Sequence, residues 1–511
     1  MKQAVRVTFA LITMLVIIAV SAVMVFVPGP TSWVDDTGSA PGTAVSQTVS
    51  PSQFSTYCPA PMDLTDSDAY GDSAFQASVG NQSTRARYAA FGSVYRSTVT
   101  PFDTSQDTDE ETLSLDASES ESSDTVMVGA ENLEQSASSR VMDTRLLESG
   151  QGAGSAGASA SWATDGDLKG VNASSCVSTD ISHAFLLRGT ITGTTQQLIV
   201  ANPSSKDTSV DIQIWGSDDS GAMSLATSST LAVPALGEAM MNLSAAAAGQ
   251  DGVYVTVSSE QTPVAAVVST IVMDGLTSKG SDFALPLAEP RKTSVVPAVV
   301  DGDYATAYLF ARQDTTVELS WVTPHGLVDA EKLTVTAQRV SVVDLGEAPD
   351  DALAVLATAE ADVDFSVASA RSGADGQEDF ALTNASAPVE SSGVALPGGV
   401  SARAVLANTA NREQSATIRV YDESGDHIRD REITLGANSA VIVDIDDLAG
   451  EGTTAAALVV DGDSRRIGWA VRLTNSQVSQ ASLAGLSTLG AASLMPQETN
   501  VWARSRNGLI P

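Results

Sequence analysis

Three similar segments, spaced about 100 residues apart, constrain the fold of this chain more than any other feature. In each segment apolar and polar residues alternate, and a polar turn that contains glycine follows. The segments are SVDIQIWGSDDSG around Trp215, TTVELSWVTPHG around Trp321 and SATIRVYDESG around Tyr421. Alternation with a period of two before such a turn is typical of a half-buried strand that enters a hairpin.

The sequences before and after these segments also align, which predicts three repeats at residues 185–291, 292–390 and 391–511. Each repeat holds six or seven short strand-like segments and almost no helical pattern. Such spacing predicts an all-β fold of tandem immunoglobulin-like β-sandwiches. A single β-propeller is the alternative, but its blades usually run about 40–50 residues with a shared motif, which the chain lacks.

A divergent β unit is expected ahead of the repeats, at residues 58–184. Its strands would come from residues 58–96 and 162–184, because residues 97–161 between them are dominated by Ser, Asp, Glu and Gly. A segment of this composition buries too little apolar area to offset its ordering entropy. We therefore expect a disordered insertion at 97–161; an acidic binding tail is the functional alternative.

The two cysteines, Cys58 and Cys176, flank this segment. In an oxidising compartment an even count favours a disulfide, and only one pairing is possible. The alternative is two free thiols. We predict the bridge.

The N-terminus predicts a membrane anchor at residues 7–27, which are uncharged and mostly apolar. A bilayer core of about 30 Å needs roughly 20 helical residues. Lys2 and Arg6 precede the run, so the positive-inside rule places residues 1–6 in the cytoplasm and everything after the anchor outside. Residues 28–57 would be a linker. A cleaved signal peptide, which would release a secreted protein, is the alternative.

Composition excludes several classes of function. The chain has 27 Lys and Arg against 62 Asp and Glu, a formal net charge of −35, so a nucleic-acid partner is not expected. Three histidines and two cysteines leave little material for a metal site, and no cofactor is expected.

Several short motifs follow one another in an order that resembles a known family. They are Cys58-Pro59, GDLKGV (166–171), HAFLLRG (183–189), LIVANPSS (198–205) and VDIQIWGSDDSG (210–221). The order is similar to that of an actinobacterial family of unknown function, DUF5719. The resemblance implies an anchored or exported protein of the cell envelope, with a link to envelope polysaccharide, and it brings no catalytic residues.

Candidate sites are few. His183, His325 and His427 have no nucleophile motif beside them and are expected to be solvated turn residues. The DGD triplets at 165–167, 301–303 and 461–463 lack the spacing of a calcium loop and are expected to be turns. Trp469 has no aromatic counterpart in the other repeats, so it is the candidate for an aromatic on a ligand-binding surface.

These observations favour a non-enzymatic, membrane-tethered scaffold or interaction module whose partner is a cell-envelope protein or glycan. A carbohydrate-binding module is the alternative. A glycoside hydrolase with paired carboxylates is less favoured, because most acids fall in turns or in the low-complexity segment.

Overall fold

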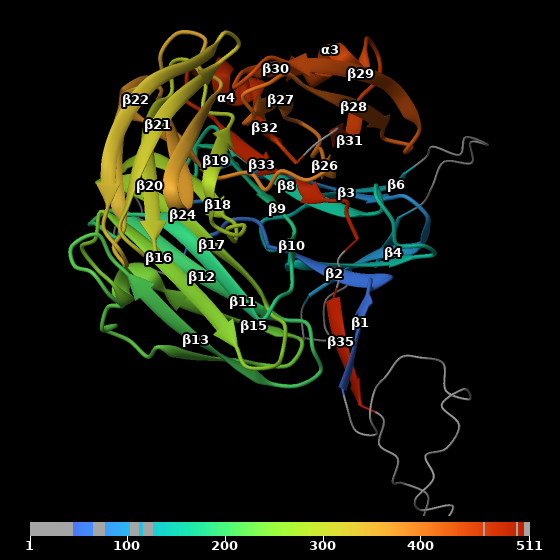
Figure 1. Cartoon of the computed structure of the whole chain (residues 1–511), viewed down its shortest axis with the longest axis horizontal. Helices are drawn as coiled ribbons and strands as arrows, with labels where there is room; N and C mark the ends of the chain where they lie inside the picture. The colour runs from blue at the N-terminus through green and yellow to red at the C-terminus, as the bar shows by residue number, and fades with distance from the viewer. Residues whose placement is uncertain are drawn as a thin grey trace, which may run out of the picture. The chain divides into compact units, whose positions relative to one another are not determined.

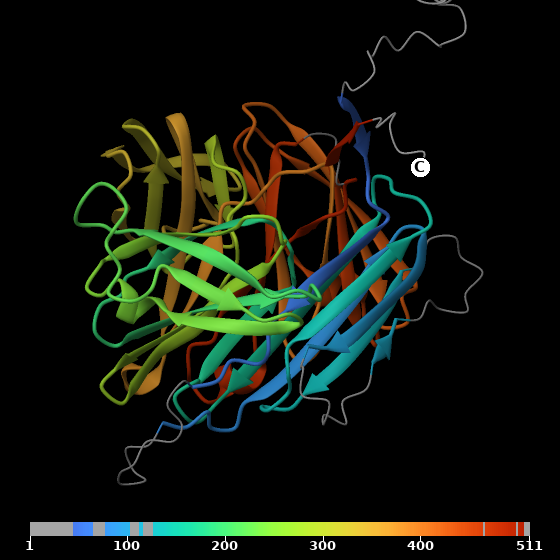
Figure 2. The same ribbon diagram turned by 90° about the horizontal axis from the view of Figure 1, so that it is seen from below.

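The computed structural model describes residues 44–64, 77–102, 112–115, 126–462, 465–496 and 499–504. Residues 51–497 form one compact body. Strands β1 (Ala44–Val49) and β35 (Thr499–Arg504) pair antiparallel and belong to a separate compact body (Figure 2). The anchor predicted at 7–27 lies outside the described residues. None of the helices in the described ranges combines the length and the apolar character that a membrane crossing requires.

The fold is all-β, as predicted, and strands dominate every part of the compact body (Figure 1). The N-terminal unit contains β2 (Gln53–Cys58), β3 (Ser83–Phe91), β4 (Val94–Pro101), β5 (Leu113–Ser114), β6 (Met127–Leu133), β7 (Arg140–Leu146), β8 (Gly154–Ala163), β9 (Gly170–Ser175) and β10 (Val177–Ser178). The first repeat contains β11 (Ser182–Arg188), β12 (Thr194–Asn202), β13 (Thr208–Trp215), β14 (Thr230–Val233), β15 (Gly237–Asn242), α2 (Leu243–Ala246), β16 (Gly252–Ser259), β17 (Ala265–Asp274) and β18 (Thr277–Ala284).

The second repeat contains β19 (Arg291–Pro297), β20 (Tyr304–Ala311), β21 (Thr315–Thr323), β22 (Gly326–Val335), β23 (Ser341–Glu347), β24 (Ala354–Ser372), η3 (Ala374–Gly376) and β25 (Glu378–Asn384). The third repeat contains β26 (Ser391–Ala395), β27 (Ser401–Asn408), β28 (Gln414–Asp422), β29 (His427–Leu435), β30 (Ala440–Asp444), α3 (Ile445–Ala449), β31 (Ala455–Gly462), β32 (Ile467–Thr474), α4 (Ser476–Gln480), β33 (Ser487–Gly490) and β34 (Ala492–Ser493).

All four units share one strand order. Counted within a unit, one sheet runs fourth–third–sixth–first and the other runs fifth–second–seventh–eighth. In the second repeat the sixth and seventh strands are one continuous strand, β24, so both sheets join into one. The N-terminal unit and the third repeat each add a two-residue strand, β10 or β34, beside the first strand. The divergent N-terminal unit is therefore a fourth copy of the same topology.

Alternation explains why the three recognised segments form strands. They are β13, β21 and β28, the third strand of each repeat, and their apolar residues point into the core while polar residues face outward. Trp215 is the last residue of β13, Trp321 lies two residues before the end of the equivalent strand β21, and both are buried. Each tryptophan belongs to the hydrophobic core of its repeat.

The prediction of a disordered insertion at 97–161 is wrong for the described part of that segment, which contains β6, β7 and most of β8. Strand β8 is buried along its whole length. Its glycines are required by close neighbours: a Cβ at Gly154 would lie 2.8 Å from Leu494 Cδ2, and one at Gly157 would lie 3.0 Å from Tyr88 Cδ1. Small residues here reflect tight packing of a central strand, not an absence of structure.

The eighth strand of each unit lies at the centre of the compact body. We call β9, β18, β25 and β33 the axial strands. Contacts run from β9 to β18, from β18 to β25, from β25 to β33 and from β33 back to β9, which closes a ring of four. Side chains also join neighbouring units directly. Arg472 of the third repeat donates two hydrogen bonds of 2.8 Å to the buried Asp303 of the second, whose carboxylate also pairs with Arg371.

Candidate functional site

The chain segments that follow the four axial strands meet in one pocket of about 480 Å³, here called the axial pocket. Most of its wall comes from residues 175–180 and 182–183, 285–288, 382–387 and 490–492. The first three segments link one unit to the next, and the fourth follows β33. Every unit therefore contributes to the site, at the C-terminal end of its axial strand.

The axial pocket carries little charge. All its lining residues are described, and among them Asp180 and His183 carry the only titratable side chains, since Cys176 is in a disulfide. His183 is 6% exposed, and burial lowers its pKa. Its Nε2 lies 2.6 Å from the carbonyl oxygen of Val264, so a neutral imidazole donates its hydrogen to that carbonyl. The expectation of a solvated histidine is wrong at this position.

The remaining lining suits binding of an uncharged ligand. Small polar residues such as Ser178, Thr179 and Ser386 line the pocket together with apolar residues such as Leu285 and Pro286. A glycoside hydrolase requires two carboxyl groups about 5–10 Å apart. Within the described wall of this pocket Asp180 is the single acid, and it is exposed.

Trp469 lines the axial pocket, but it is not a surface aromatic. The side chain is 3% exposed and belongs to the hydrophobic core of the third repeat. Its Nε1 donates a hydrogen bond of 2.8 Å to Ser392 Oγ. Since all residues of β32 except the last are buried, this ring offers no open face for stacking, and the prediction of a ligand-surface aromatic at Trp469 is wrong.

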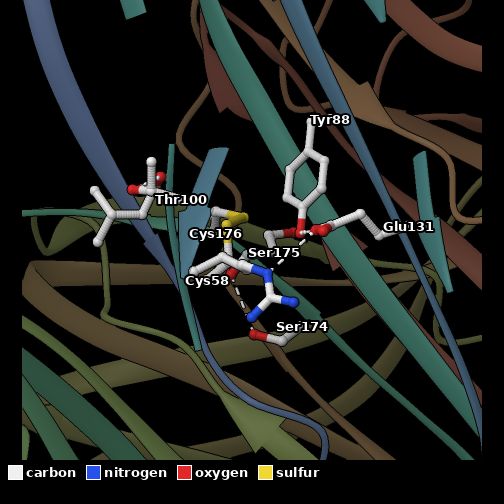
Figure 3. Close-up of a disulfide and its surroundings, with 9 residues drawn as sticks. Cys58, Tyr88, Thr100, Glu131, Ser174, Ser175 and Cys176 are labelled. Carbon is white, nitrogen blue, oxygen red and sulfur yellow. Dashed lines mark hydrogen bonds and ion pairs between the residues drawn. A yellow bond between two sulfur atoms is a disulfide. The ribbon is translucent and has the colours of Figure 1, made fainter. Parts of the chain in front are cut away.

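The disulfide lies beside the same pocket. Cys58 ends β2, and Cys176, between β9 and β10, lines the pocket; the structure joins them as predicted (Figure 3). On the core side of the bridge, Tyr88 donates a hydrogen bond of 2.9 Å to Glu131, which also accepts from Arg140 at 3.3 Å. Burial, followed by the charge of Glu131, raises the pKa of Tyr88 well above its usual range.

Each axial strand carries a buried polar residue that contributes to the contacts between units: Asn172, Asp282, Asp379 and Ser487. We call them the axial polar ring. The Asp379 carboxylate accepts from the backbone N–H of Val171 at 2.8 Å and from that of Leu486 at 3.0 Å. It therefore connects the second repeat to the N-terminal unit and to the third repeat.

Asp282 makes the complementary connections. Its carboxylate accepts from the N–H of Leu382 at 2.9 Å and from Ser487 Oγ at 2.8 Å, which joins the first repeat to the second and third. Burial raises the pKa of Asp282 to about 7, against the opposing effect of these hydrogen bonds. Burial likewise raises the pKa of Asp379 well above its usual range. This pair fastens the ring, and the hydrogen bonds described above come to it from backbone N–H groups and a serine hydroxyl.

The other predicted sites are structural. His325 is exposed in a turn, as expected. His427 begins strand β29, is half-buried and contacts Asp430 at 2.7 Å, so the expectation of a solvated turn residue is wrong there. The DGD triplets do not hold a common site: Asp167 accepts from the backbone of Ser78, Asp303 is paired as described above, and Asp461 pairs with Arg419; Asp463 lies outside the described residues. No cluster with metal-ligand spacing occurs within the described ranges.

Sequence reasoning missed the axial polar ring, although a signal for it exists. The motif DFAL occurs at both 282–285 and 379–382, and a glycine two positions earlier recurs in Gly170-x-Asn172, Gly280-x-Asp282 and Gly485-x-Ser487. Two of these glycines approach the same group. A Cβ at Gly170 or Gly280 would lie 2.6 or 2.7 Å from the carboxylate of Asp379, and both have positive φ.

Fold and pocket together define an all-β protein in which four topologically equivalent units surround a pocket that carries little charge. The chain belongs to the family of unknown function DUF5719, which matches residues 128–446, more than half of its length. The match begins inside the segment that composition alone had suggested was disordered. No curated protein matches the chain.

Proposed function

We propose that this protein is a non-enzymatic interaction module of the cell envelope, and that its axial pocket receives an uncharged segment of a partner protein. The observation that carries the proposal is the construction of the pocket. Links from all four units form its wall, and Asp180 and His183 are the only titratable groups on it. A site assembled from rigidly connected units is suited to holding a partner in a defined position.

Two features support a location outside the cytoplasm. The apolar run at 7–27, with Lys2 and Arg6 before it, favours a single-pass anchor with the N-terminus inside. The bridge between Cys58 and Cys176 favours an oxidising compartment. The net charge of −35 argues against nucleic acid as the partner.

We also infer that the four units are relatives of immunoglobulin domains. In each unit the second strand pairs with the fifth and the third with the sixth, which are the central pairs of that fold. In an immunoglobulin domain the first strand lies beside the second, and the last strand lies beside the sixth. In each unit of this protein the seventh strand lies beside the second, and the first strand lies beside the sixth. A permuted order of this kind would account for a sequence pattern typical of the fold.

A carbohydrate ligand is the second candidate, because hydroxyl groups are frequent in the pocket wall. It is less favoured because Trp469, the aromatic closest to such a role, is buried. A glycoside hydrolase is least favoured, since the pocket wall supplies one acid.

Photo-cross-linking in intact cells tests the proposal. A photoreactive residue is placed at Ala387 or Ser182, which are exposed and line the pocket, and at the exposed Asp329 on β22 as the control. We expect a polypeptide to be captured from both pocket positions and not from the control. Capture of glycan alone would support the second candidate, and equal capture from all three positions would refute a role for the pocket.

A further inference from the structure

The two sulfur atoms of the disulfide have unlike surroundings. Cys176 is half-buried and lines two pockets, the axial pocket and a smaller one of about 170 Å³ that we call the side pocket. Cys58, in contrast, is 5% exposed and belongs to the hydrophobic core of the N-terminal unit. Of the two cysteines, Cys176 is therefore the one that borders space open to a reagent from solvent.

Gly157 leaves the sulfur atom of Cys176 uncovered on the side-pocket wall. This glycine lines the side pocket, and its carbonyl accepts a hydrogen bond of 2.7 Å from the backbone N–H of Cys176. A Cβ at Gly157 would clash with Cys176 Sγ, whereas it would lie 3.4 Å from Cys58 Sγ. Cys176 Sγ thus lies next to a wall residue that has no side chain to shield it.

A buried arginine lies on the other side of the bridge. Arg140 of β7 is directly opposite Cys58 of β2 and is 5% exposed. The Cβ atoms of such a pair are about 4.5–5.5 Å apart. The guanidinium donates to Glu131 at 3.3 Å and to the carbonyl oxygen of Ser138 at 2.7 Å. A neighbouring cation stabilises a thiolate, so Arg140 favours the departure of Cys58, while Glu131, which Tyr88 also contacts (Figure 3), opposes it.

We propose that this bridge is an exchangeable disulfide, which a protein dithiol of the same compartment reduces by attack on Cys176 from the pocket side. The thiolate of the dithiol forms a bond to Cys176 Sγ, the bond between the two cysteines breaks, and Cys58 leaves with the electron pair as a thiolate. The second thiol of the reductant then loses its proton and attacks its own mixed disulfide, which releases Cys176. The dithiol is oxidised to a disulfide, and the protein bridge is reduced to two thiols.

Reduction acts on the wall of the axial pocket, and this part of the inference rests on the proposed function. Residues 175–180 supply part of that wall. Besides the bridge, the two residues of β10 fasten this link to β2, and a single β-bridge joins Asp180 to Val264. Loss of the covalent attachment gives the link greater freedom. The oxidised form therefore holds the partner, and the reduced form releases it.

The rate of reduction tests whether exchange takes place in the folded protein. Full-length protein is treated with dithiothreitol at increasing urea concentrations, and the new thiols are trapped by alkylation. We expect a rate that does not change with urea in the range where the protein stays folded. A bridge that is reached only through unfolding would be reduced at a rate that rises with urea together with global unfolding, and this result would overturn the inference.

The attacked sulfur is identified with a monothiol. A short treatment with 2-mercaptoethanol is stopped with acid, free thiols are alkylated, and the cysteine peptides are analysed by mass spectrometry. We expect the mixed disulfide on Cys176 and the alkyl group on Cys58, since Cys176 lines both pockets. The reverse distribution would overturn the proposed direction of attack.

Charge variants test the role of the buried arginine. Glu131→Gln leaves the guanidinium without its acid and should speed reduction by about 3- to 10-fold, because the Cys58 thiolate leaves more readily. Adding Arg140→Gln to it should reverse this gain. Destabilisation alone would speed reduction in both, so a slower rate in the double variant cannot come from unfolding. Arg145→Gln, exposed on the same strand, is the control and should not change the rate. Equal rates in the first two variants would refute the role of Arg140.

Cross-linking in cells tests the effect on the pocket. Replacement of both Cys58 and Cys176 by serine should lower capture of polypeptide from a photoreactive residue at Ala387 by about fivefold or more, the low end of common coupling between two sites. Leu319→Ala is destabilised in the core of the second repeat but keeps the bridge, and it should capture as the parent does. Unchanged capture without the cysteines would refute control of the pocket by the bridge. Absence of capture with the bridge intact would refute the proposed function, whereas the reduction kinetics test exchange on their own.

Discussion

Asp282 should make the stability of the protein depend on pH, and Asp282→Asn should remove that dependence. Burial raises the pKa of this carboxyl from its usual 3.8 to about 7, so the folded protein binds the proton more tightly than the unfolded chain does. Protonation therefore stabilises the fold. The contribution is complete below about pH 4 and is lost as pH rises toward 7.

The size of the effect follows from the shift. A difference of about 3 pKa units corresponds to roughly 4 kcal/mol at about 1.4 kcal/mol per unit, and this is an upper estimate for a buried group. In the variant, the amide oxygen can still accept from the N–H of Leu382, and the amide nitrogen can donate to Ser487 Oγ. The asparagine thus resembles the protonated acid and should be close to wild type at pH 4 and more stable than wild type at pH 8.

Urea denaturation followed by tryptophan fluorescence, from pH 4 to pH 8, measures the difference in unfolding free energy between the two proteins. Carboxylates that do not interact with Asp282 titrate alike in both proteins and cancel, whereas the pKa of Asp379, which the charge of Asp282 raises, should be less elevated in the variant. Asp274→Asn, at the exposed end of β17, is the control and should show no trend with pH. A constant difference between wild type and Asp282→Asn across this range would refute the reasoning.

Substitutions and a deletion elsewhere in the protein should lower its stability by amounts that follow from the contacts they remove. Arg472→Ala leaves the buried Asp303 without its main partner and should lower the free energy of unfolding by about 3–5 kcal/mol. Arg371→Ala removes a half-exposed partner of the same aspartate and should lower it by about 1 kcal/mol or less. Equal losses would contradict the view that Arg472 is the main partner. Gly157→Ala places a methyl group against the disulfide and should lower stability by about 1–3 kcal/mol, so an unchanged melting temperature would argue against that packing. Deletion of residues 101–158 should abolish folding, because it removes β6 and β7, and a soluble deletion variant with a cooperative transition would show otherwise. Digestion without reductant should yield one linked pair of cysteine peptides, and Cys176→Ser should cost about 2–4 kcal/mol; two alkylatable thiols in the protein purified without reductant would disprove the bridge.

Much of the fold could be predicted from alternation alone. The segments at Trp215, Trp321 and Tyr421 predicted strands because one face of each is buried and the other is solvated, which is the condition that produces a period of two. The disulfide was predictable because two cysteines allow one pairing.

Alternation failed where both faces of a strand are buried. Strand β8 consists mostly of Gly, Ser and Ala, and its tight neighbours select small side chains rather than apolar ones. The prediction from hydrophobic content, that this strand is disordered, was therefore wrong. The axial strands posed the same problem, because polar residues such as Asp282 are satisfied there by backbone groups of other units, which no local pattern reveals.

Three residues singled out from the sequence, Cys176, His183 and Trp469, proved to lie in the pocket wall. The rest of the wall consists of links between units, and their approach to one another depends on the ring. Trp469 was misjudged because the absence of an aromatic counterpart in other repeats says nothing about exposure. Its strand, β32, is buried on both faces.

Closure of the ring has a consequence for how this architecture can evolve. Open arrays of repeats gain and lose copies easily, because each copy touches only its neighbours and the ends are capped. Here the last axial strand, β33, contacts the first, β9, and Asp379 takes hydrogen bonds from both the N-terminal unit and the third repeat. A fifth copy would separate those partners, and loss of one copy would leave two edges facing solvent. Once duplication had produced four units, selection for correct folding would therefore keep their number constant. The links around the pocket would remain free to change in sequence.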